Sequence, residues 1–450
     1  MNMISKIELI FKKFLPSPFS IAILLSIIVF IIAYLFTKSS VIDLLKYWEK
    51  GLWNAGLMSF GMQMMLMLVL GYVIALSSSF NRIIVYITPL CKNTANAAFL
   101  VAASTIIVSW INWGLGLIFG AILVRKVGEH AINNNITINY PLIGACGYSG
   151  LMVWHGGLSG SIPLKISEPN HFAEIITNKV ILNKLPNGIN FDSTVFSNMN
   201  ITVSLLLLII VPLTLYFIGK IKVVQNKIKL KQLTTKTEPV YPFGAERIDH
   251  SKIFGKVIGF IILTVAIIKA INTSSISFIN PNYINLCLFS FALILHKNIF
   301  SFLNAVNKAI SSASGILIQF PLYFGIMGIM NQSGLVDVLS DFFISISNQK
   351  TFPIFTMLSG GLVNIFVPSG GGQWAVQGPI VIQSAMEIGV SIPKSIMALS
   401  YGDQLTNMLQ PFWALPLLGI TELKAKEILP YTLVIMITGF MIFFSCLMIF

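Results

Sequence analysis

The sequence predicts an all-α polytopic membrane protein with two inverted-topology repeats, each containing a re-entrant helical hairpin and a broken transmembrane helix. Three observations lead to this fold class. First, the 450 residues are 55% hydrophobic and only 10% charged, whereas about a quarter of the residues of a soluble domain are charged. Second, two long uncharged stretches are interrupted by glycine or proline. Third, the two halves share an ordered set of short matches. These features exclude a soluble protein.

Apolar runs that can cross the roughly 30 Å hydrocarbon layer of a bilayer occur along the whole chain. The run 19–37 follows three lysines, and no small-residue cleavage site comes after it. We therefore expect a first transmembrane helix there and not a cleaved signal. The other expected spans lie at about 57–76, 140–163, 200–219, 254–271, 283–296 (a short run), 314–331, 395–419 and 430–449.

Two uncharged stretches, 93–124 and 351–386, are too long to be one straight span each. At about 1.5 Å per residue, either would extend roughly 50 Å as a helix. Each is broken near its middle, by "INWGLG" (111–116) and by "PSGGG" (368–372). Glycine and proline disfavour a continuous helix. We therefore expect two re-entrant hairpins, each of which enters and leaves the membrane on one side.

With two hairpins, the loops alternate between two sides of the membrane, and the net charge falls on one side. That side holds the N-terminus and the loops 82–92, 125–139, 220–256, 297–308 and 422–427, with 20 basic and 7 acidic residues. The opposite loops hold 8 of each. The positive-inside rule makes the basic side cytoplasmic, in the bacterial cytoplasmic (inner) membrane. The charge of +13 is thus a topology signal, and we expect no nucleic-acid partner.

The two halves of the chain match in order at five places, which are Gln63 with Gln319, "KNT" (92–94) with "QKT" (349–351), Asn112 with Asn364, Tyr148 with Tyr401 and Pro163 with Pro416. The offsets of 256, 257, 252, 253 and 253 residues are nearly constant and indicate an internal repeat. We expect a first repeat at 1–219, a basic cytoplasmic loop with a linking span at 220–282, and an inverted second repeat at 283–450. Two such repeats with opposed broken helices are typical of secondary transporters.

The helix breaks are expected to line a binding site, because irregular backbone at membrane depth must be buried in protein or face a polar cavity. A half-helix that begins after Gly372 would present free N–H groups to an anion. The carbonyl end before the break would suit a cation such as Na⁺. The alternative is that the glycines only permit close helix packing, although three in succession beside Pro368 and Ser369 exceed that need.

The candidate substrate-binding residues lie at the two breaks and in the polar spans that follow them. Asn112 and Asn364 precede the breaks, and their amides can either bind a ligand or cap the broken helices. Asp403, Asn407 and Gln410 are spaced as i, i+4 and i+7 and share one helix face. The full candidate set is Asn112, Trp113, Gly114, Ser159, Asn364, Ser369, Gly370, Gly371, Gly372, Gln373, Asn407 and Gln410.

Asp403 is the only acidic residue inside an expected span, and intramembrane carboxylates usually mark ion or proton pathways. We interpret it as a ligand of the coupling ion together with Asn112 and Asn364. The alternative is a structural carboxylate near a helix start. His155 is a candidate proton relay, although a lone histidine is more often simply hydrogen-bonded. No arginine lies in an expected span, which argues against a bidentate clamp on a dicarboxylate and favours a small monocarboxylate.

The sequence offers no pattern for a bound metal, a cofactor or an enzyme. The four cysteines are far apart, and no HExxH motif or Ser-His-Asp constellation is present. The only ion that we expect is a coupling H⁺ or Na⁺. The main hypothesis is therefore a cation-coupled symporter, and the alternatives are a transporter of another small carboxylate such as a dicarboxylate, an intramembrane enzyme and a passive channel.

Four segments make the chain similar to the bacterial short-chain fatty acid transporter family: "NIFVPSGGGQWAVQGP", "SYGDQ…NMLQPFWALP", "INWGLGLIFGA" and "SGILIQFPLYFGI". The similarity runs from "FLPSPF" (14–19) to the last span. It implies uptake of acetoacetate or butyrate, with a small monocarboxylate and the lipid bilayer as partners. It also implies membership of a larger ion-transporter group with paired hairpins and an elevator-like movement. A homodimer is one assembly that the sequence allows.

Two positions depart from the pattern of that family. Gln373 stands where the family often has histidine, so a proton role at this position does not apply here. Asp403 stands where the family often has glutamate, and the carboxylate needed for an ionic role is kept.

Overall fold

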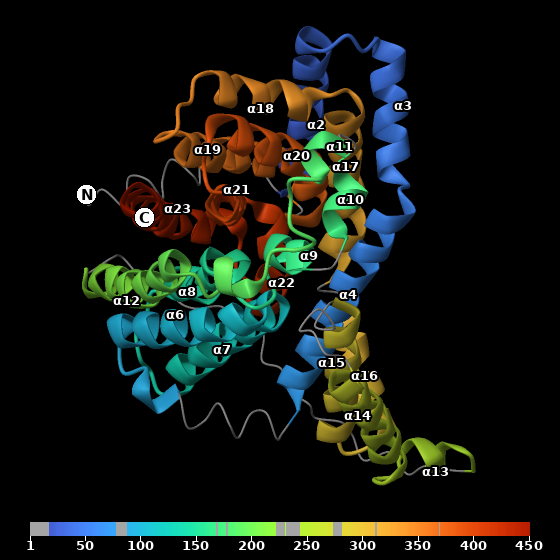
Figure 1. Ribbon diagram of the computed structural model, residues 1–450. Coiled ribbons are helices and arrows are strands. Elements are labelled where there is room, and N and C mark those ends of the chain that lie inside the picture. The colour runs from blue at the N-terminus through green and yellow to red at the C-terminus, as the bar shows by residue number, and fades with distance from the viewer. Residues whose placement is uncertain are drawn as a thin grey trace.

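The computed structural model describes residues 18–77, 88–167, 170–176, 179–221, 230, 244–272, 281–310, 313–368 and 370–450. Every regular element in these ranges is a helix (Figure 1). The chain is thus an all-helical membrane protein, as the sequence predicts. The N-terminus, residues 82–87 and most of the basic loop 220–256 lie outside the described residues. The division into two inverted repeats stays a prediction.

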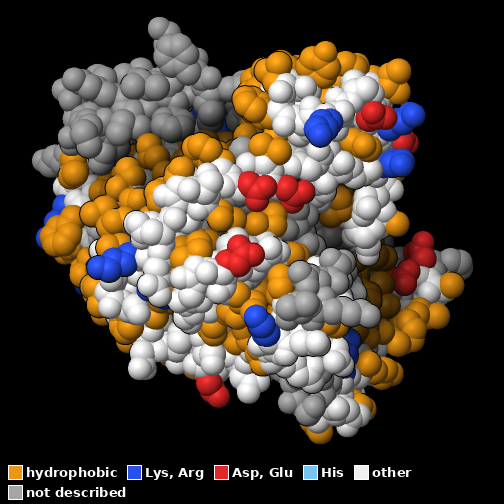
Figure 2. All heavy atoms as spheres, turned by 45° about the horizontal axis from the view of Figure 1, so that its top comes forward, with side chains coloured by type: hydrophobic (Ala, Val, Ile, Leu, Met, Phe, Trp, Pro, Cys, Tyr) orange, Lys and Arg blue, Asp and Glu red, His pale blue; other side chains and the backbone are white. Residues whose placement is uncertain are grey.

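Several helices are long and apolar enough to cross a membrane. Among the described residues these are α6 (Thr94–Ile111), α12 (Asn198–Lys220), α14 (Phe254–Asn272) and α23 (Ala425–Ile449). A bent pair at 41–74 adds a fifth candidate. Hydrophobic side chains cover much of the face in Figure 2, with only scattered charged groups between them. Helices with exposed apolar surface of this extent are suited to a lipid environment.

The remaining helices of ten or more residues are α2 (Pro18–Phe36), α3 (Val41–Leu52), α4 (Ala55–Leu76), α7 (Trp113–Asn133), α15 (Pro281–Leu295), α16 (Ile299–Ile310), α17 (Ser314–Gln332), α18 (Leu335–Ser345), α19 (Phe352–Phe366), α20 (Gly370–Ile388), α21 (Ile392–Thr406) and α22 (Pro411–Thr421). The shorter ones are η1 (Thr88–Leu90), α8 (Tyr140–Tyr148), η2 (Ser149–Met152), η3 (Trp154–Gly156), α9 (Ser161–Ser167), α10 (His171–Ile175), α11 (Lys179–Leu182), η4 (Phe191–Ser193), α13 (Glu246–Asp249) and η7 (Asn407–Leu409).

Two helical layers enclose the centre of the molecule. Helices α6, α7, α8 and α12 form one layer, and α18 to α21 form the other, with α22 and α23 between them (Figure 1). Helices α15 and α16 pack beside α4, α14 packs on α15, and the three extend away from both layers. The centre between the layers is where the interrupted helices meet.

Four helical paths are interrupted inside their apolar runs. Helix α6 gives way to α7 at Asn112, and α19 gives way to α20 at residues 367–369. The path from α8 passes through two 3-10 turns before α9, and α21 passes through η7 before α22. The two predicted broken transmembrane helices are thus present as broken helices. The expectation that the half-helix after the second break starts beyond Gly372 is wrong, because α20 already begins at Gly370.

Helix α6, taken by itself, is long and apolar enough to cross the membrane once. The re-entrant course of 93–124 therefore stays a prediction.

The second helix of this pair continues to Asn133, although the sequence places a loop at 125–139. The side chain of Arg125 is 1% exposed and donates to the carbonyl of Ile420 at 2.8 Å. It also forms ion pairs of 3.1 Å with Glu129 and with Glu422. A buried guanidinium is tolerated when its donors are paired in this way. These contacts explain why the charge does not end the helix, and they tie α7 to the end of α22.

Helices α3, α16 and α18 form in segments that the sequence assigns to loops. Each is amphipathic, with an apolar stripe toward the protein. Helix α3 begins at a capping box in which Ser40 accepts from the Asp43 N–H and Asp43 accepts from the Ser40 N–H. Short amphipathic helices of this kind do not stand out against long apolar runs.

Candidate functional site

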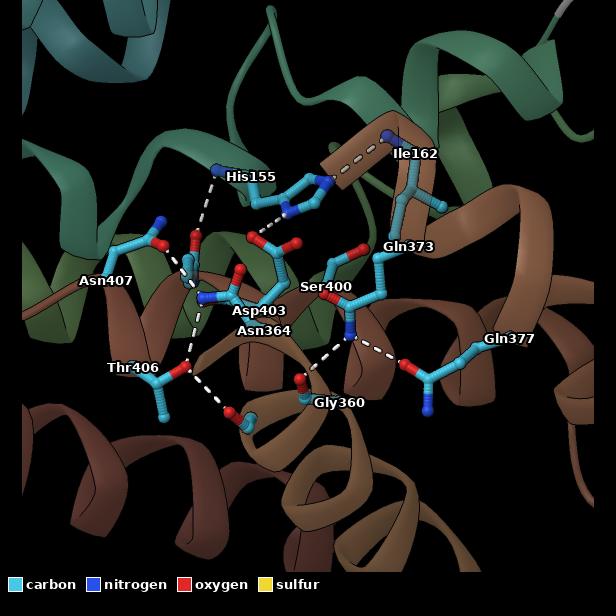
Figure 3. Close-up of polar contacts among 12 residues, drawn as sticks. His155, Ile162, Gly360, Asn364, Gln373, Gln377, Ser400, Asp403, Thr406 and Asn407 are labelled. Carbon is cyan, nitrogen blue, oxygen red and sulfur yellow. Dashed lines mark hydrogen bonds and ion pairs between the residues drawn. The ribbon is translucent and has the colours of Figure 1, made fainter. Parts of the chain in front are cut away.

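The end of α19 is joined to the end of α21 by the side chain of Asn364. Its amide nitrogen donates to the carbonyl of Asp403 at 2.6 Å, to Oγ1 of Thr406 at 3.0 Å and to Oδ1 of Asn407 at 2.8 Å (Figure 3). The amide of Gln410 donates in turn to the carbonyl of Asn364. The structure thus brings together the polar residues that the sequence singles out at the second break and in the span after it.

Asp403 faces His155 across the centre of the molecule. Oδ1 of Asp403 lies 3.3 Å from Nδ1 of His155, and both side chains are buried. The backbone N–H of Ile162 donates to Nε2 of the same ring at 3.2 Å. A ring nitrogen that accepts a hydrogen bond carries no proton. One ring nitrogen of His155 thus accepts from a backbone N–H and the other lies against the Asp403 carboxylate.

The beginning of α20 lies against this pair. A Cβ added at Gly370 would lie 2.8 Å from Cε1 of His155 and 3.1 Å from the indole of Trp154, so only glycine fits there. Gly371 is exposed and has open space around the position of a Cβ, and Gly372 is half-buried. Ser369, the other candidate at this tip, lies outside the described residues. The tip therefore combines a tight contact at Gly370 with an open backbone at Gly371.

Gln373 lies one turn into α20, where its amide nitrogen donates to the carbonyl of Gly360 at 2.8 Å and to Oε1 of Gln377 at 2.7 Å. Gly360 stands one helical turn before Asn364 on α19. The side-chain amides of Gln373 and Asn364 therefore lie along the same side of that helix. Figure 3 shows the side chains of Gln373, Ser400 and Asp403 next to one another. The site therefore receives side chains from α19, α20, α21 and η3.

Eight buried polar atoms in this cluster have no hydrogen-bond partner among the described residues. The acceptors are Asn364 Oδ1, Gln373 Oε1, Asp403 Oδ2 and Gln410 Oε1, and the donors are Trp154 Nε1, Gln404 Nε2 and Asn407 Nδ2. The eighth atom is Nδ1 of His155, 3.3 Å from Oδ1 of Asp403. Each amide is oriented by a bond at its other end, as when Gln404 accepts the His155 N–H at 2.9 Å. Folded proteins leave few such atoms unpaired. A cluster of them indicates a place where a ligand or an ion binds.

The candidates at the first break form a second group. The side chain of Asn112 accepts the N–H of Leu115 at 2.9 Å and so caps α7. The N–H of Trp113 donates to Oγ of Ser159 at 2.9 Å, and Gly114 lies against Met67. The structure does not bring Asn112 into the contacts between Asn364 and Asp403. A role for it as a ligand stays a prediction.

Aromatic rings connect the two groups. The ring of Trp113 lies 6.0 Å from that of Trp154 and 5.4 Å from that of Trp413, centroid to centroid. Trp154 also stacks on His155 at 4.2 Å. Trp374 belongs to a different place, because its indole N–H donates to Nε2 of His171 at 2.9 Å. Trp113, Trp154 and Trp413 thus form an aromatic wall beside the polar cluster.

Two tyrosines link the halves of the chain at the breaks. The hydroxyl of Tyr148 donates to the carbonyl of Asn407 at 2.8 Å. The hydroxyl of Tyr401 donates to Oδ1 of Asn200 at 2.9 Å, and Asn200 donates to the carbonyl of Gly156 at 2.8 Å. Each tyrosine therefore supports the break in the other half, and these are the two tyrosines that the sequence pairs.

We expect Tyr401→Phe to lower the free energy of unfolding by about 1–3 kcal/mol, because Oδ1 of Asn200 would lose its buried donor. Thermal unfolding of the purified protein in detergent measures this. Tyr34→Phe is the matched control, since that side chain is 53% exposed on α2. Equal melting temperatures for the two variants would contradict the role assigned to Tyr401.

Gln404 and Trp154 are functional candidates that the sequence reasoning does not include in its site. Gln404 directly follows Asp403 and is a polar residue inside an apolar run, so the criterion that selects Asn407 also selects it. No sequence signal distinguishes Trp154 from an interface anchor. A cavity of about 430 Å³ lies elsewhere, between α6 and α12, is lined by apolar residues such as Phe99 and Leu213, and holds none of the candidates.

Sequence comparisons with known proteins agree on one family. A family model described as "Short chain fatty acid transporter" matches residues 1–450. A protein of Escherichia coli (strain K12) named for short-chain fatty acid transport is 35% identical over 96% of both chains. A protein of Haemophilus influenzae with the same name is 34% identical, over 95% of this chain and 94% of its own. Among solved structures, the Alcanivorax borkumensis YdaH transporter covers 95% of this chain and 97% of its own, at 14% identity and a TM-score of 0.44, which is too low to equate individual helices.

Proposed function

This chain belongs to the short-chain fatty acid transporter family, and from that premise we propose that it couples the uptake of a small monocarboxylate to the entry of a cation. It is a membrane transporter and not an enzyme. Acetoacetate and butyrate are the substrates that we propose. The membrane would be the bacterial cytoplasmic membrane, with the N-terminus and the loop 220–256 in the cytoplasm.

This proposal rests on one buried cluster that contains both hydrogen-bond donors and hydrogen-bond acceptors without partners among the described residues. The donor groups of Trp154, Gln404 and Asn407 suit a carboxylate. The oxygens of Asn364 and Asp403 suit a cation. Bringing one ion alone into this environment is costly, whereas the two together compensate each other's charge. Binding of each ion then favours binding of the other, which is the basis of symport.

The tryptophan wall supports a short apolar substrate. A carboxylate held by Asn407 and Gln404 would place its alkyl chain toward Trp113 and Trp154, whose rings lie 6.0 Å apart. Each buried methylene contributes about 0.8 kcal/mol, so the space beside these rings sets the preferred chain length. An apolar wall gives no comparable support for a second carboxylate.

We also propose that the two halves are inverted repeats and that the substrate is exposed alternately to the two sides. The reciprocal contacts of Tyr148 and Tyr401 support this, because each joins one half to the break of the other. Irregular backbone at mid-membrane and opposed broken helices are typical of such transporters.

Trp113→Ala is expected to shift the preference toward longer acids. Removing the indole opens room for additional methylenes, so the uptake ratio of hexanoate to butyrate should rise about tenfold. Competition assays in proteoliposomes measure the ratio. Trp53→Ala is the control, since Trp53 is exposed at the end of α3. An unchanged ratio in Trp113→Ala would remove this side chain from the substrate site.

The proposed function is tested with the full chain reconstituted into proteoliposomes, with labelled butyrate or acetoacetate added to the external buffer. We expect saturable uptake above equilibrium when Na⁺ and pH gradients are imposed together, and counterflow in their absence. Simple equilibration without saturation would indicate a channel. Accumulation of succinate but not of butyrate would indicate a dicarboxylate transporter.

A further inference from the structure

We propose that the coupling ion is Na⁺ and not a proton, and that Asp403, Asn364, Gln373 and Ser400 provide its oxygen ligands. This inference rests on the proposed function and identifies the cation that the same site binds. It follows from the kind, number and orientation of the polar atoms around Asp403.

The first step concerns the amides. The nitrogen of Asn364 donates to three oxygens, and the nitrogen of Gln373 donates to the carbonyl of Gly360 and to Gln377. Rotating either amide would place its oxygen against these acceptors, so the observed orientation is fixed. Oδ1 of Asn364 and Oε1 of Gln373 are therefore genuine acceptors, and neither has a donor among the described residues.

The second step concerns the place where these oxygens lie. Asn364 is bonded to the backbone of Asp403 at 2.6 Å. Ser400 precedes Asp403 by one helical turn, and its hydroxyl donates to the carbonyl of Ile396 at 3.0 Å, which leaves its oxygen as an acceptor. Figure 3 shows the side chains of Asn364, Gln373, Ser400 and Asp403 gathered around one region. All four side chains are buried.

The third step compares a proton with Na⁺. A proton on Asp403 supplies one O–H donor, which can satisfy one of the waiting acceptors and leaves the others unpaired. Na⁺ binds several oxygens at once, and amide and carbonyl oxygens are suitable ligands for it. Hard divalent ions usually take more carboxylates than this site offers. The single carboxylate surrounded by neutral oxygens therefore suits a monovalent metal ion.

The fourth step concerns His155, the titratable group that faces Asp403. Its Nε2 accepts the N–H of Ile162 at 3.2 Å and its Nδ1 lies 3.3 Å from Oδ1 of Asp403, whereas Oδ2 of Asp403 has no partner among the described residues and can bind an ion. Among the described residues, the other charged side chain that is buried is Arg125, which is paired with Glu129 and Glu422 at the far end of α7. No second buried charge described near Asp403 thus competes with the ion for the carboxylate.

The experiment separates the two gradients. Proteoliposomes with equal pH on both sides receive an inward Na⁺ gradient, and a second set receives a pH gradient in choline or potassium buffer without Na⁺. We expect labelled butyrate to accumulate at least about tenfold in the first set and, in the second, to reach only the level of protein-free liposomes, which neutral butyric acid enters by diffusion. Accumulation above that level with the pH gradient alone would overturn the inference. If neither gradient drives accumulation, the proposed function itself fails.

Variants test the ligands independently of transport. Gln373→Leu should weaken binding of ²²Na⁺ to the purified protein about tenfold or more, the scale of one lost charge-assisted contact. Gln373→Asn keeps both the amide oxygen and the amide nitrogen on a shorter side chain, so it should bind Na⁺ more tightly than Gln373→Leu, and it provides a second variant if the leucine protein does not fold. Unchanged Na⁺ affinity in a folded Gln373→Leu, or weaker binding by a folded Gln373→Asn than by Gln373→Leu, would overturn the assignment.

The matched control is Asn285→Leu. Asn285 on α15 is also buried, and its amide nitrogen donates to the carbonyl of Gln63 at 2.8 Å while its oxygen has no partner among the described residues. It lies outside the cluster around Asp403. This variant should bind ²²Na⁺ like the unsubstituted protein. If it weakens binding as much as Gln373→Leu does, the effect does not come from an ion site at Asp403.

Discussion

Asp403→Asn should reduce gradient-driven uptake of butyrate at least about a hundredfold while the protein remains folded. The substitution keeps the size of the side chain and removes the charge that we assign to cation binding. A loss of about 2.7 kcal/mol corresponds to this factor and lies in the range of contacts made by charged groups. Initial rates in proteoliposomes measure it, and thermal unfolding in detergent confirms the fold.

Asp403→Glu is the companion variant. It retains the carboxylate with one more methylene, so we expect reduced but measurable gradient-driven uptake. Comparing the two variants distinguishes the effect of the side-chain charge at position 403 from the effect of the side-chain size. Normal accumulation by Asp403→Asn would show that the carboxylate has no part in coupling, and the assignment of the ion site would then be withdrawn.

Gly402→Val should prevent folding. Helices α19 and α21 approach so closely at this point that an added Cβ would lie 2.1 Å from the carbonyl of Met357 and 2.8 Å from the nitrogen of Gly361. These are backbone atoms, which cannot move aside without separating the helices. We expect a loss of more than about 3 kcal/mol, a large part of the roughly 5–15 kcal/mol that stabilises a typical domain. Folded yield by size-exclusion chromatography measures the effect.

Gly371→Ala provides the contrast for that substitution. No described atom lies within 4 Å of the position of its Cβ, and alanine favours a helix more than glycine does. Yield and thermal stability should equal those of the unsubstituted protein. Equal yields for Gly402→Val and Gly371→Ala would show that the close crossing of α19 and α21 is not needed for folding.

Many of the helices can be predicted because a segment that crosses the lipid must be a long run of apolar residues. Helix α12 at 198–220 and helix α14 at 254–272 overlap the runs expected at 200–219 and 254–271 within two residues. The burial of Arg125 within α7 could not be predicted from local sequence, since one of its two ion pairs is with Glu422, 297 residues away. Contacts between distant segments leave no mark on local hydropathy.

The residues of the candidate site could be predicted in part, as the helices could. Polar residues inside apolar runs identify Asn364, Asp403 and Asn407, which the structure places in contact. The sequence does not reveal which end of each amide is already bonded, and this decides what the site can bind. Nor does it reveal that the Ile162 N–H donates to Nε2 of His155. These features depend on the exact positions of atoms and not on residue type.

The buried pairing of Arg125 has a consequence for biosynthesis. The ribosome releases α7 long before it reaches Glu422, 297 residues later. During that interval the guanidinium must be accommodated without its distant partner, and the local counter-ion is Glu129, one turn further along the same helix at 3.1 Å. Of the two acids that pair with Arg125, only Glu129 is synthesised close to it, and the contact with Glu422 requires the last two helices.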